Sequence, residues 1–180
     1  KIHMMKEPGV GLPSRAPLNE ADAKGFMQDF ARGLQALRTV DIIHRDLKDE
    51  NLLLSTRCGG ALRERPVLKI ADFGFAKQLD DLTRTVTECG SPAYMAPEVF
   101  RSSVLQDAFA TVAPGYEAGY DAKADLWSVG CILYGMLTKG LVFSARVRSK
   151  DDLIAELARE LRDGVQKTLP ESFEHEDGRG

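Results

Sequence analysis

Residues 44–51 read HRDLKDEN, and the chemistry of these eight side chains organises the rest of the chain. Asp46 is placed to accept a proton from an attacking hydroxyl group. Asn51, five residues later, can offer its amide oxygen to a magnesium ion beside nucleotide phosphates. A carboxylate and an amide at this spacing are typical of a phosphoryl-transfer loop, so the stretch predicts a reaction as well as a fold.

Three further motifs follow in the order that this chemistry requires. They are Asp72-Phe73-Gly74, Ala96-Pro97-Glu98 and Asp125-Leu126-Trp127, the last of which opens a long apolar segment. Each motif constrains a different part of one mechanism. Four motifs in the required order are therefore a strong signal.

The overall composition is that of an ordinary globular protein. The chain has 180 residues, enough for about one domain with a hydrophobic core, and 43% of them are apolar and 28% charged. The net charge of -3 gives no basic field of the kind that binds nucleic acid. We therefore expect no nucleic-acid partner.

Cysteine usage and apolar runs bear on the compartment. Cys58, Cys89 and Cys131 have no CxxC spacing, which favours unpaired thiols in a reducing compartment and a cytoplasmic location. The longest uncharged run, residues 127–138, is too short to span a bilayer, so we expect no transmembrane segment. No signal peptide is visible, and the opening at Lys1 suggests that the sequence begins inside a longer protein.

The chain divides into three regions, and the fold class predicted for it is α+β, mainly α. Residues 1–17, with two glycines and three prolines, are expected to be a loose lead-in. Residues 18–163 should form the folded domain. Residues 164–180 are acidic and glycine-tipped, which is typical of a disordered tail.

Capping residues mark the first and last helices. Asn19 is a good N-cap for a helix that runs to about Thr39 and buries one face. Ser149 caps a last helix, Asp152 completes its capping box, and Gly164 ends it.

A third helix should begin near Asp125 and end at Gly140. No charge occurs between residues 128 and 138, so we expect this helix to be buried on every side. Asp125 is the one charge drawn into that interior, and we expect it to accept backbone N–H bonds from the catalytic loop.

Two short apolar runs, residues 52–54 and 67–70, predict a small antiparallel β ribbon across a turn-rich connection. Residues 40–43 form a short extended segment that leads into the catalytic loop. The ribbon sets the distance between Asn51 and Asp72, which we expect at its opposite ends as two magnesium ligands.

Two other stretches lack a clear pattern. Residues 77–90 are polar and predict a mobile loop, in which Thr83, Thr85 and Thr87 are candidate phosphate acceptors. A phosphate group there, with a charge of about -1.5 to -2, would be able to pair with Arg45. Residues 101–118 look like an insertion, with one or two amphipathic turns, that lies on the surface.

Together the four motifs resemble the C-terminal lobe of eukaryotic protein kinases, over roughly residues 18–161. Lys48, two residues after Asp46, is the choice of serine/threonine kinases. The strings NLLLST (51–56), LKIADFGFAK (68–77), CGSPAYMAPEV (89–99) and YDAKADLWSVG (120–130) are most similar to the autophagy-initiating, ULK-type kinases.

The resemblance implies a protein-kinase-like C-lobe with a small antiparallel β ribbon and with the N-lobe absent. It implies transfer of the ATP γ-phosphate to serine or threonine hydroxyls of protein substrates, with Mg²⁺, in autophagy initiation. Regulatory subunits are further expected partners.

Site roles follow from the same resemblance, position by position. Asp46 is the catalytic base, Lys48 stabilises the transferring phosphoryl group, Asn51 and Asp72 bind magnesium, and Leu53 lies under the adenine. His44 and Phe73 stack in the spine that links the lobes, while Glu98 and Asp125 are structural. Thr87 matches the activating phosphosite, with Arg45 as its partner, and Ser91 helps to seat the substrate hydroxyl.

The sequence departs from the family pattern at several points. Asp49 stands where the family usually has proline, which adds a carboxylate beside the site. The insertion at residues 101–118 puts the docking of substrate in doubt. The 180 residues show no glycine-rich loop and no Val-Ala-Ile-Lys lysine. The arginine that normally pairs with Glu98 in the family would lie beyond the last residue, and a buried Glu98 without that cation would be costly.

Three interpretations remain open. The first is an active serine/threonine kinase of which the chain holds a partial catalytic domain, expected to be inactive alone. The second is a pseudokinase or scaffold fragment that acts as a binding module, but such proteins commonly lose the base or a metal ligand. Here Asp46, Lys48, Asn51 and Asp72 are all present. The third is a truncated product that never folds stably.

Overall fold

The computed structural model describes residues 17–58, 61–78, 89–100, 102–112, 122–143 and 149–164. These residues form four α-helices, α1 (Glu20–Thr39), α2 (Ser103–Val112), α3 (Ala122–Thr138) and α4 (Lys150–Asp163). Two small antiparallel sheets accompany them: β1 (Ile42–Ile43) with β4 (Lys77–Gln78), and β2 (Leu52–Cys58) with β3 (Ala61–Ile70). The predicted α+β class, mainly α, is confirmed for this part of the chain.

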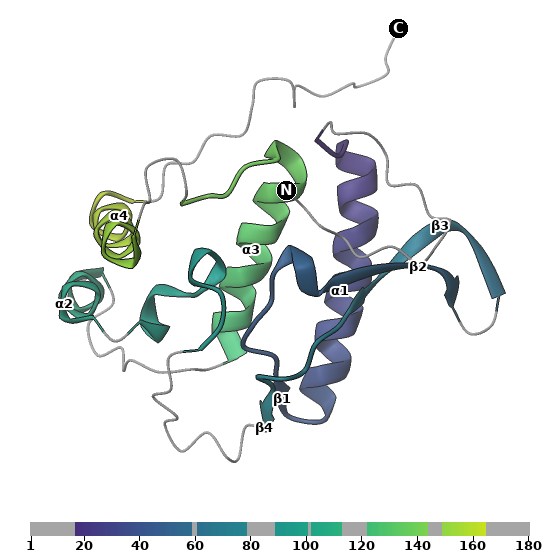
Figure 1. The fold of residues 1–180 in the computed structure, drawn as a ribbon, viewed down its shortest axis with the longest axis horizontal. Helices are drawn as coiled ribbons and strands as arrows, with labels where there is room; N and C mark the ends of the chain where they lie inside the picture. The colour runs from purple at the N-terminus through teal and green to yellow at the C-terminus, as the bar shows by residue number, and fades with distance from the viewer. Residues whose placement is uncertain are drawn as a thin grey trace, which may run out of the picture.

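The helices α1 and α3 lie side by side in the middle of the molecule (Figure 1). The pair formed by α2 and α4 packs on one side of α3, and the β2–β3 hairpin crosses α1 on the other. One hydrophobic core joins these elements, with Phe30, Leu47, Leu105 and Leu157 among its most buried side chains. The catalytic loop therefore runs through the centre of the fold.

Local capping explains where α1 and α4 begin. The Asn19 side chain accepts a hydrogen bond of 2.8 Å from the backbone N–H of Asp22, as predicted. Ser149 and Asp152 form a complete reciprocal capping box, with both hydrogen bonds at 3.1 Å. Each cap satisfies backbone donors that the first helical turn leaves unpaired.

The hairpin is anchored on α1 by the side chain of Ile70, which packs closely over Gly33. A Cβ atom at Gly33 would lie 2.9 Å from Cδ1 of Ile70, the last residue of β3, so only glycine fits there without a shift. On the same helix, Asp29 is buried and accepts a hydrogen bond of 3.3 Å from the backbone N–H of Leu68. These contacts fix the end of β3 that leads into Asp72.

One detail of the predicted ribbon was wrong. Asn51 and Asp72 were expected at its opposite ends, but Leu52 pairs with Ile70, so both residues lie at the same, open end, Asn51 just before β2 and Asp72 just after β3. Antiparallel pairing brings the two chain ends of a hairpin together. The strands keep one register from Leu52 to Ser55 and change register before Arg57, where Thr56 of β2 stands against residues 63–66 of β3.

The expectation that α3 is buried on every side was also wrong. Leu126 is 61% exposed and Gly130 is exposed, while Cys131, Ile132 and Met136 are buried. The absence of charge reflects a composition that is apolar throughout, and the helix still keeps one face toward solvent. Uncharged sequence alone does not establish burial, because much of a protein's surface is apolar.

The insertion contributes to the core instead of lying loosely on the surface. Its residues 103–112 form α2, in which Leu105 and Ala108 are buried, and this helix packs against α4. A helix paired with another along a buried stripe is a stable unit. The expectation of a surface excursion is thus wrong for this part of the insertion.

Some expectations fall outside the described residues. These are most of the lead-in and the tail, and the loop positions Thr83, Thr85 and Thr87. Within the described ranges, each helix is too short or too polar to cross a membrane.

Candidate active site

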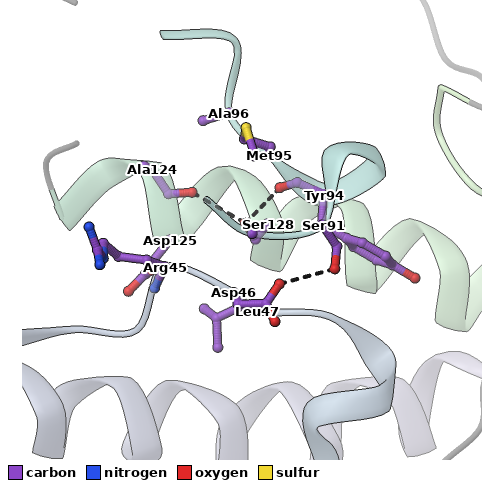
Figure 2. A pocket seen from close by; sticks show the side chains of 11 residues that line it. Arg45, Asp46, Leu47, Ser91, Tyr94, Met95, Ala96, Ala124, Asp125 and Ser128 are labelled. Carbon is purple, nitrogen blue, oxygen red and sulfur yellow. Dashed lines mark hydrogen bonds between the residues drawn. The ribbon is translucent and has the colours of Figure 1, made fainter. Parts of the chain in front are cut away.

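The carboxylate of Asp46 is the centre of the site. It is only 4% exposed and receives three hydrogen bonds. Lys48 Nζ lies 2.8 Å from Oδ2, the Asn51 amide nitrogen donates to Oδ2 at 3.2 Å, and the Ser91 hydroxyl donates to Oδ1 at 3.0 Å. Figure 2 shows the Ser91 bond, which joins the catalytic loop to a segment more than forty residues later.

Lys48 also donates to the Ser91 hydroxyl oxygen at 3.0 Å, so Asp46, Lys48 and Ser91 form a closed triangle. Lys48 thus places a cation beside the Asp46 carboxyl group. Hydrogen bonds to a charged group are stronger than neutral ones, which holds these three side chains in one arrangement.

Asp125 fixes the backbone of the catalytic loop. Its carboxylate accepts hydrogen bonds from the backbone N–H of His44 at 2.9 Å and of Arg45 at 3.0 Å, as the sequence predicted. Arg45 has a φ of 67°, a left-handed conformation that costs free energy for a non-glycine residue. Burial raises the pKa of Asp125, and the two backbone N–H groups oppose that rise.

His44 connects the loop to the segment before Asp72. The ring is fully buried, and Nε2 lies 3.0 Å from the carbonyl oxygen of Ala71. A carbonyl only accepts, so Nε2 carries the proton. The rings of His44 and Phe73, which were expected to stack on each other, are in contact, with their centroids 5.2 Å apart and their planes tilted by 58°. Phe73 is 49% exposed.

Arg45 makes a second connection to the same segment. Its Nε–H donates to the carbonyl of Phe75 at 2.7 Å. The side chain is buried and thus runs from the catalytic loop to the residues that follow Asp72.

Asn51 and Asp72 form a set of oxygen donors that suits magnesium. The amide nitrogen of Asn51 makes hydrogen bonds to Asp46, at 2.8 Å to the carbonyl and 3.2 Å to Oδ2, which leaves its amide oxygen to face a ligand. The Asn51 carbonyl accepts from the N–H of Ala71 at 2.9 Å, so Asp72 follows directly. Asp72 is exposed, and one of its oxygens accepts from Gly74.

Magnesium is usually held by one or two protein oxygens together with substrate phosphates. Among the described residues, no group of three or more histidine, cysteine or carboxylate side chains is placed to hold a metal alone. The amide oxygen of Asn51 and the exposed carboxylate of Asp72 are oxygen donors of the kind that magnesium prefers.

The remaining predicted residues lie around this centre. Leu53 is half-buried on β2, opposite Lys69. Glu98 is in the 3-10 helix η4 (Pro97–Val99) and is half-buried, so the expected full burial of its carboxylate was wrong. Thr87 lies outside the described residues.

A small pocket opens beside Asp46 (Figure 2). Its lining includes Arg45 and Asp46 from the loop, Ser91 and Tyr94 from the segment across it, and Asp125 and Ser128 from α3. The pocket marks where three separate parts of the chain meet.

Sequence reasoning missed the role of Tyr94. Its hydroxyl donates to Asp49 at 2.5 Å, and its backbone carbonyl accepts from the Ser128 hydroxyl at 2.7 Å. Asp49 was noted only as an extra carboxylate. A serine inside an apolar helix was the available signal for Ser128, because a buried hydroxyl needs a partner.

The sequence of the chain is similar to those of known proteins. The family model described as protein kinase domain matches residues 7–176. The Arabidopsis thaliana serine/threonine-protein kinase ATG1c is 53% identical over 119 residues, which cover 66% of this chain and 14% of the relative. The Caenorhabditis elegans serine/threonine-protein kinase unc-51 is 40% identical over 159 residues, which cover 86% of this chain and 16% of that protein.

A third relative, the Dictyostelium discoideum serine/threonine-protein kinase atg1, is 48% identical over 120 residues, which cover 67% of this chain and 15% of that protein. The chain therefore spans less than one fifth of the length of each of these three relatives.

Proposed function

The chain belongs to the protein kinase family, and we propose that it is part of a serine/threonine kinase that transfers the ATP γ-phosphate to hydroxyls of protein substrates. The observation that carries the proposal is the convergence of Lys48, Asn51 and Ser91 on the buried carboxylate of Asp46. Phosphoryl transfer depends mainly on positioning and charge stabilisation, which such a rigid cluster supplies.

Each residue of the cluster has a proposed task. Asp46 accepts the proton of the attacking hydroxyl, and Ser91, which already donates to Oδ1, marks the side from which that hydroxyl approaches. Lys48 places a positive charge beside both groups, where it balances charge on the transferring phosphoryl group.

Asn51 and Asp72 are the proposed magnesium ligands, and Leu53 the surface under the adenine of ATP. Bound magnesium would neutralise negative charge on the phosphates. The contribution of this chain is to hold both oxygen donors at the open end of one hairpin, next to Asp46.

The other predicted residues have supporting tasks. His44 and Asp125 hold the loop, Phe73 offers an exposed ring for packing, and Glu98 supports η4. We also propose that Thr87 is an activating phosphosite paired with Arg45, which phosphate detection by mass spectrometry of the active protein would test. Consistent absence of phosphate at Thr87 would remove that part.

We place the described residues in the larger, helical lobe of the kinase domain, with limits 18–163, an insertion at 101–118, a lead-in at 1–17 and a tail at 164–180. The similarity to ATG1 and unc-51 kinases supports a role in autophagy initiation in the cytoplasm, with protein substrates and regulatory subunits. The placement in the helical lobe and the proposed role in autophagy both rest on likeness to the family.

The test is phosphate transfer by the full-length protein from γ-labelled ATP to a general protein substrate. We expect incorporation by the wild type and a loss of about 10²-fold or more in Asp46→Asn, because a general base contributes about that much. Asp107→Asn, an exposed change on α2, is the matched control and should behave as the wild type. A wild type without transfer would instead favour a binding module.

A further inference from the structure

Tyr94 ties together three parts of the chain that meet at the site. Its hydroxyl donates to Oδ1 of Asp49 at 2.5 Å, and its carbonyl accepts from the Ser128 hydroxyl on α3 at 2.7 Å. Its backbone N–H donates to the carbonyl of Ser91 at 2.9 Å, within the turn that forms the 3-10 helix η3 (Pro92–Tyr94). Movement of Tyr94 would therefore move Ser91.

The bond between Tyr94 and Asp49 is of a strong type. Both residues are buried, at 9% and 8% exposure, and 2.5 Å is the short end of the range for a hydroxyl that donates to a carboxylate. Burial raises the pKa of Tyr94, and Asp49 raises it further, so the phenol keeps its proton at neutral pH. A buried carboxylate without such a donor would be costly.

Asp49 stands at the other end of this tie. It is the first residue of the 3-10 helix η1 (Asp49–Asn51), with Lys48 before it and Asn51 two positions after it. Both of these flanking residues, Lys48 and Asn51, donate hydrogen bonds from their side chains to the carboxylate of Asp46. The Asp49–Tyr94 bond thus joins the turn that carries Ser91 to the turn that carries Lys48 and Asn51.

We propose that Asp49 and Tyr94 are a positioning pair that seats the Ser91 turn on the catalytic loop and so controls how well a protein substrate's hydroxyl is held beside Asp46. The pair acts through Ser91 and Lys48 and does not itself touch reacting atoms. This inference rests on the proposed kinase function. It assigns a use to the carboxylate that replaces the usual proline at position 49.

The test uses steady-state kinetics of the full-length protein with separate titrations of ATP and protein substrate. Tyr94→Phe removes one oxygen atom, and Asp49→Ala removes the acceptor. We expect each to lower kcat/KM for the protein substrate by about tenfold, the effect of losing a hydrogen bond to a charged group, with KM for ATP changed less than about twofold. Asp49→Asn keeps an acceptor oxygen and should lose less activity than Asp49→Ala.

The double variant distinguishes a pair from two separate effects. If the residues act together, Tyr94→Phe with Asp49→Ala should be no worse than the poorer single variant, because each removes the same bond. Tyr134→Phe, which removes a phenol hydroxyl from a half-buried position on α3, is the matched control and should leave all constants unchanged. Additive losses, or a Tyr94→Phe enzyme equal to this control, would overturn the proposal.

The measurements also distinguish general damage to the enzyme, and failure of the proposed kinase function, from loss of substrate positioning. A loss of kcat/KM for protein substrate and for ATP alike would indicate general damage and overturn a positioning role. If the wild type transfers no phosphate, the proposed function fails, and hydrogen exchange at the backbone amides of Ser91, Ala93 and Tyr94 decides whether the pair seats this turn. Faster exchange in Tyr94→Phe and Asp49→Asn than in Tyr134→Phe would support the seating of this turn, and equal exchange would overturn it. Asp49→Asn, of unchanged size, serves if Tyr94→Phe does not fold.

Discussion

At the scale of single residues, the buried carboxylate of Asp125 holds the backbone of the loop that carries Asp46. Its two oxygens satisfy two consecutive backbone N–H groups, one of them on Arg45, whose φ of 67° is held in this way. Asp125→Ala would orphan both donors, each at a cost of about 1–3 kcal/mol, and urea denaturation of the purified protein should show that loss of stability. Unchanged stability would contradict this account of the loop.

The same carboxylate predicts a dependence of stability on pH. Its pKa is raised in the folded protein, chiefly by burial, so the folded state binds this proton more tightly than the unfolded state does. The contribution of Asp125 to the free energy of unfolding therefore falls as pH rises from about 4, the usual carboxyl value, through the raised folded-state pKa. The stability of the wild type relative to Asp125→Asn should decline across that window in denaturation at several pH values. A relative stability that rises with pH would be inconsistent with the raised pKa.

Sequence reasoning found the residues of the site more readily than their partners. One motif, residues 44–51, contains Asp46, Lys48 and Asn51, and Asp72 begins the next motif. Short spacing along the chain limits how far apart the side chains of one motif can lie. The bond from Asp49 to Tyr94 joins residues 45 positions apart, and no local pattern encodes it. Such contacts depend on how elements pack, which the order of residues does not reveal directly.

At the scale of elements, two glycines in helices provide a matched comparison. A Cβ atom at Gly33 in α1 would lie 2.9 Å from Ile70, whereas one at Gly130 in α3 would meet nothing within 4 Å. Alanine at Gly130 should gain about 1 kcal/mol of stability from helix propensity. Alanine at Gly33 should gain less, and leucine there should destabilise by about 1–3 kcal/mol through overpacking. Urea denaturation of the three variants tests this order, and equal gains at both glycines would refute the close approach.

The cap of α4 gives a second test at this scale. Ser149→Ala breaks a capping box whose two hydrogen bonds are both 3.1 Å long. We expect a loss of about 1 kcal/mol in the free energy of unfolding, the usual value for an N-cap. Ser103→Ala, an exposed change in the first turn of α2, is the comparison variant. Equal effects at the two serines would argue against the capping box.

Elements with strong local signals were predictable, and elements made by pairing were not. The bounds of α1 and α4 followed from caps, and the β2–β3 hairpin from two apolar runs. The strand β4 was missed because two residues, Lys77 and Gln78, carry no alternation and are extended only through pairing with β1. The open face of α3, with Leu126 exposed, depends on what packs around the helix, which its uncharged sequence does not specify.

At the scale of the whole molecule, the 180 residues carry the proposed base Asp46, the cation Lys48 and the proposed metal ligands Asn51 and Asp72, but their sequence shows no glycine-rich loop. Phosphoryl transfer depends on positioning of the nucleotide, so the chain alone should turn over ATP little or not at all, while the full-length protein should be active. Coupled measurement of ADP release for both proteins tests this. Robust turnover by the 180 residues would show that they hold the nucleotide unaided.

Fold class and family were predictable at this scale because four motifs in order leave few alternatives. The helix pair α2–α4 was not, since residues 101–118 were expected on the surface. Packing of α2 on α4 requires side chains from two distant segments to match, as Leu105 and Leu157 do in the common core. A hydrophobic pattern in either segment alone is compatible with several partners.

The change of register between Ser55 and Arg57 divides the β2–β3 hairpin into an inner and an outer half. The irregular stretch takes up residues 63–66 of β3 against Thr56 of β2, so a change in the length of the outer half need not reach Asn51 and Asp72. That half is consequently the place where evolution can lengthen or shorten the protein, or where an engineer can graft a fluorescent reporter, while the pairing of Leu52 with Ile70 is kept.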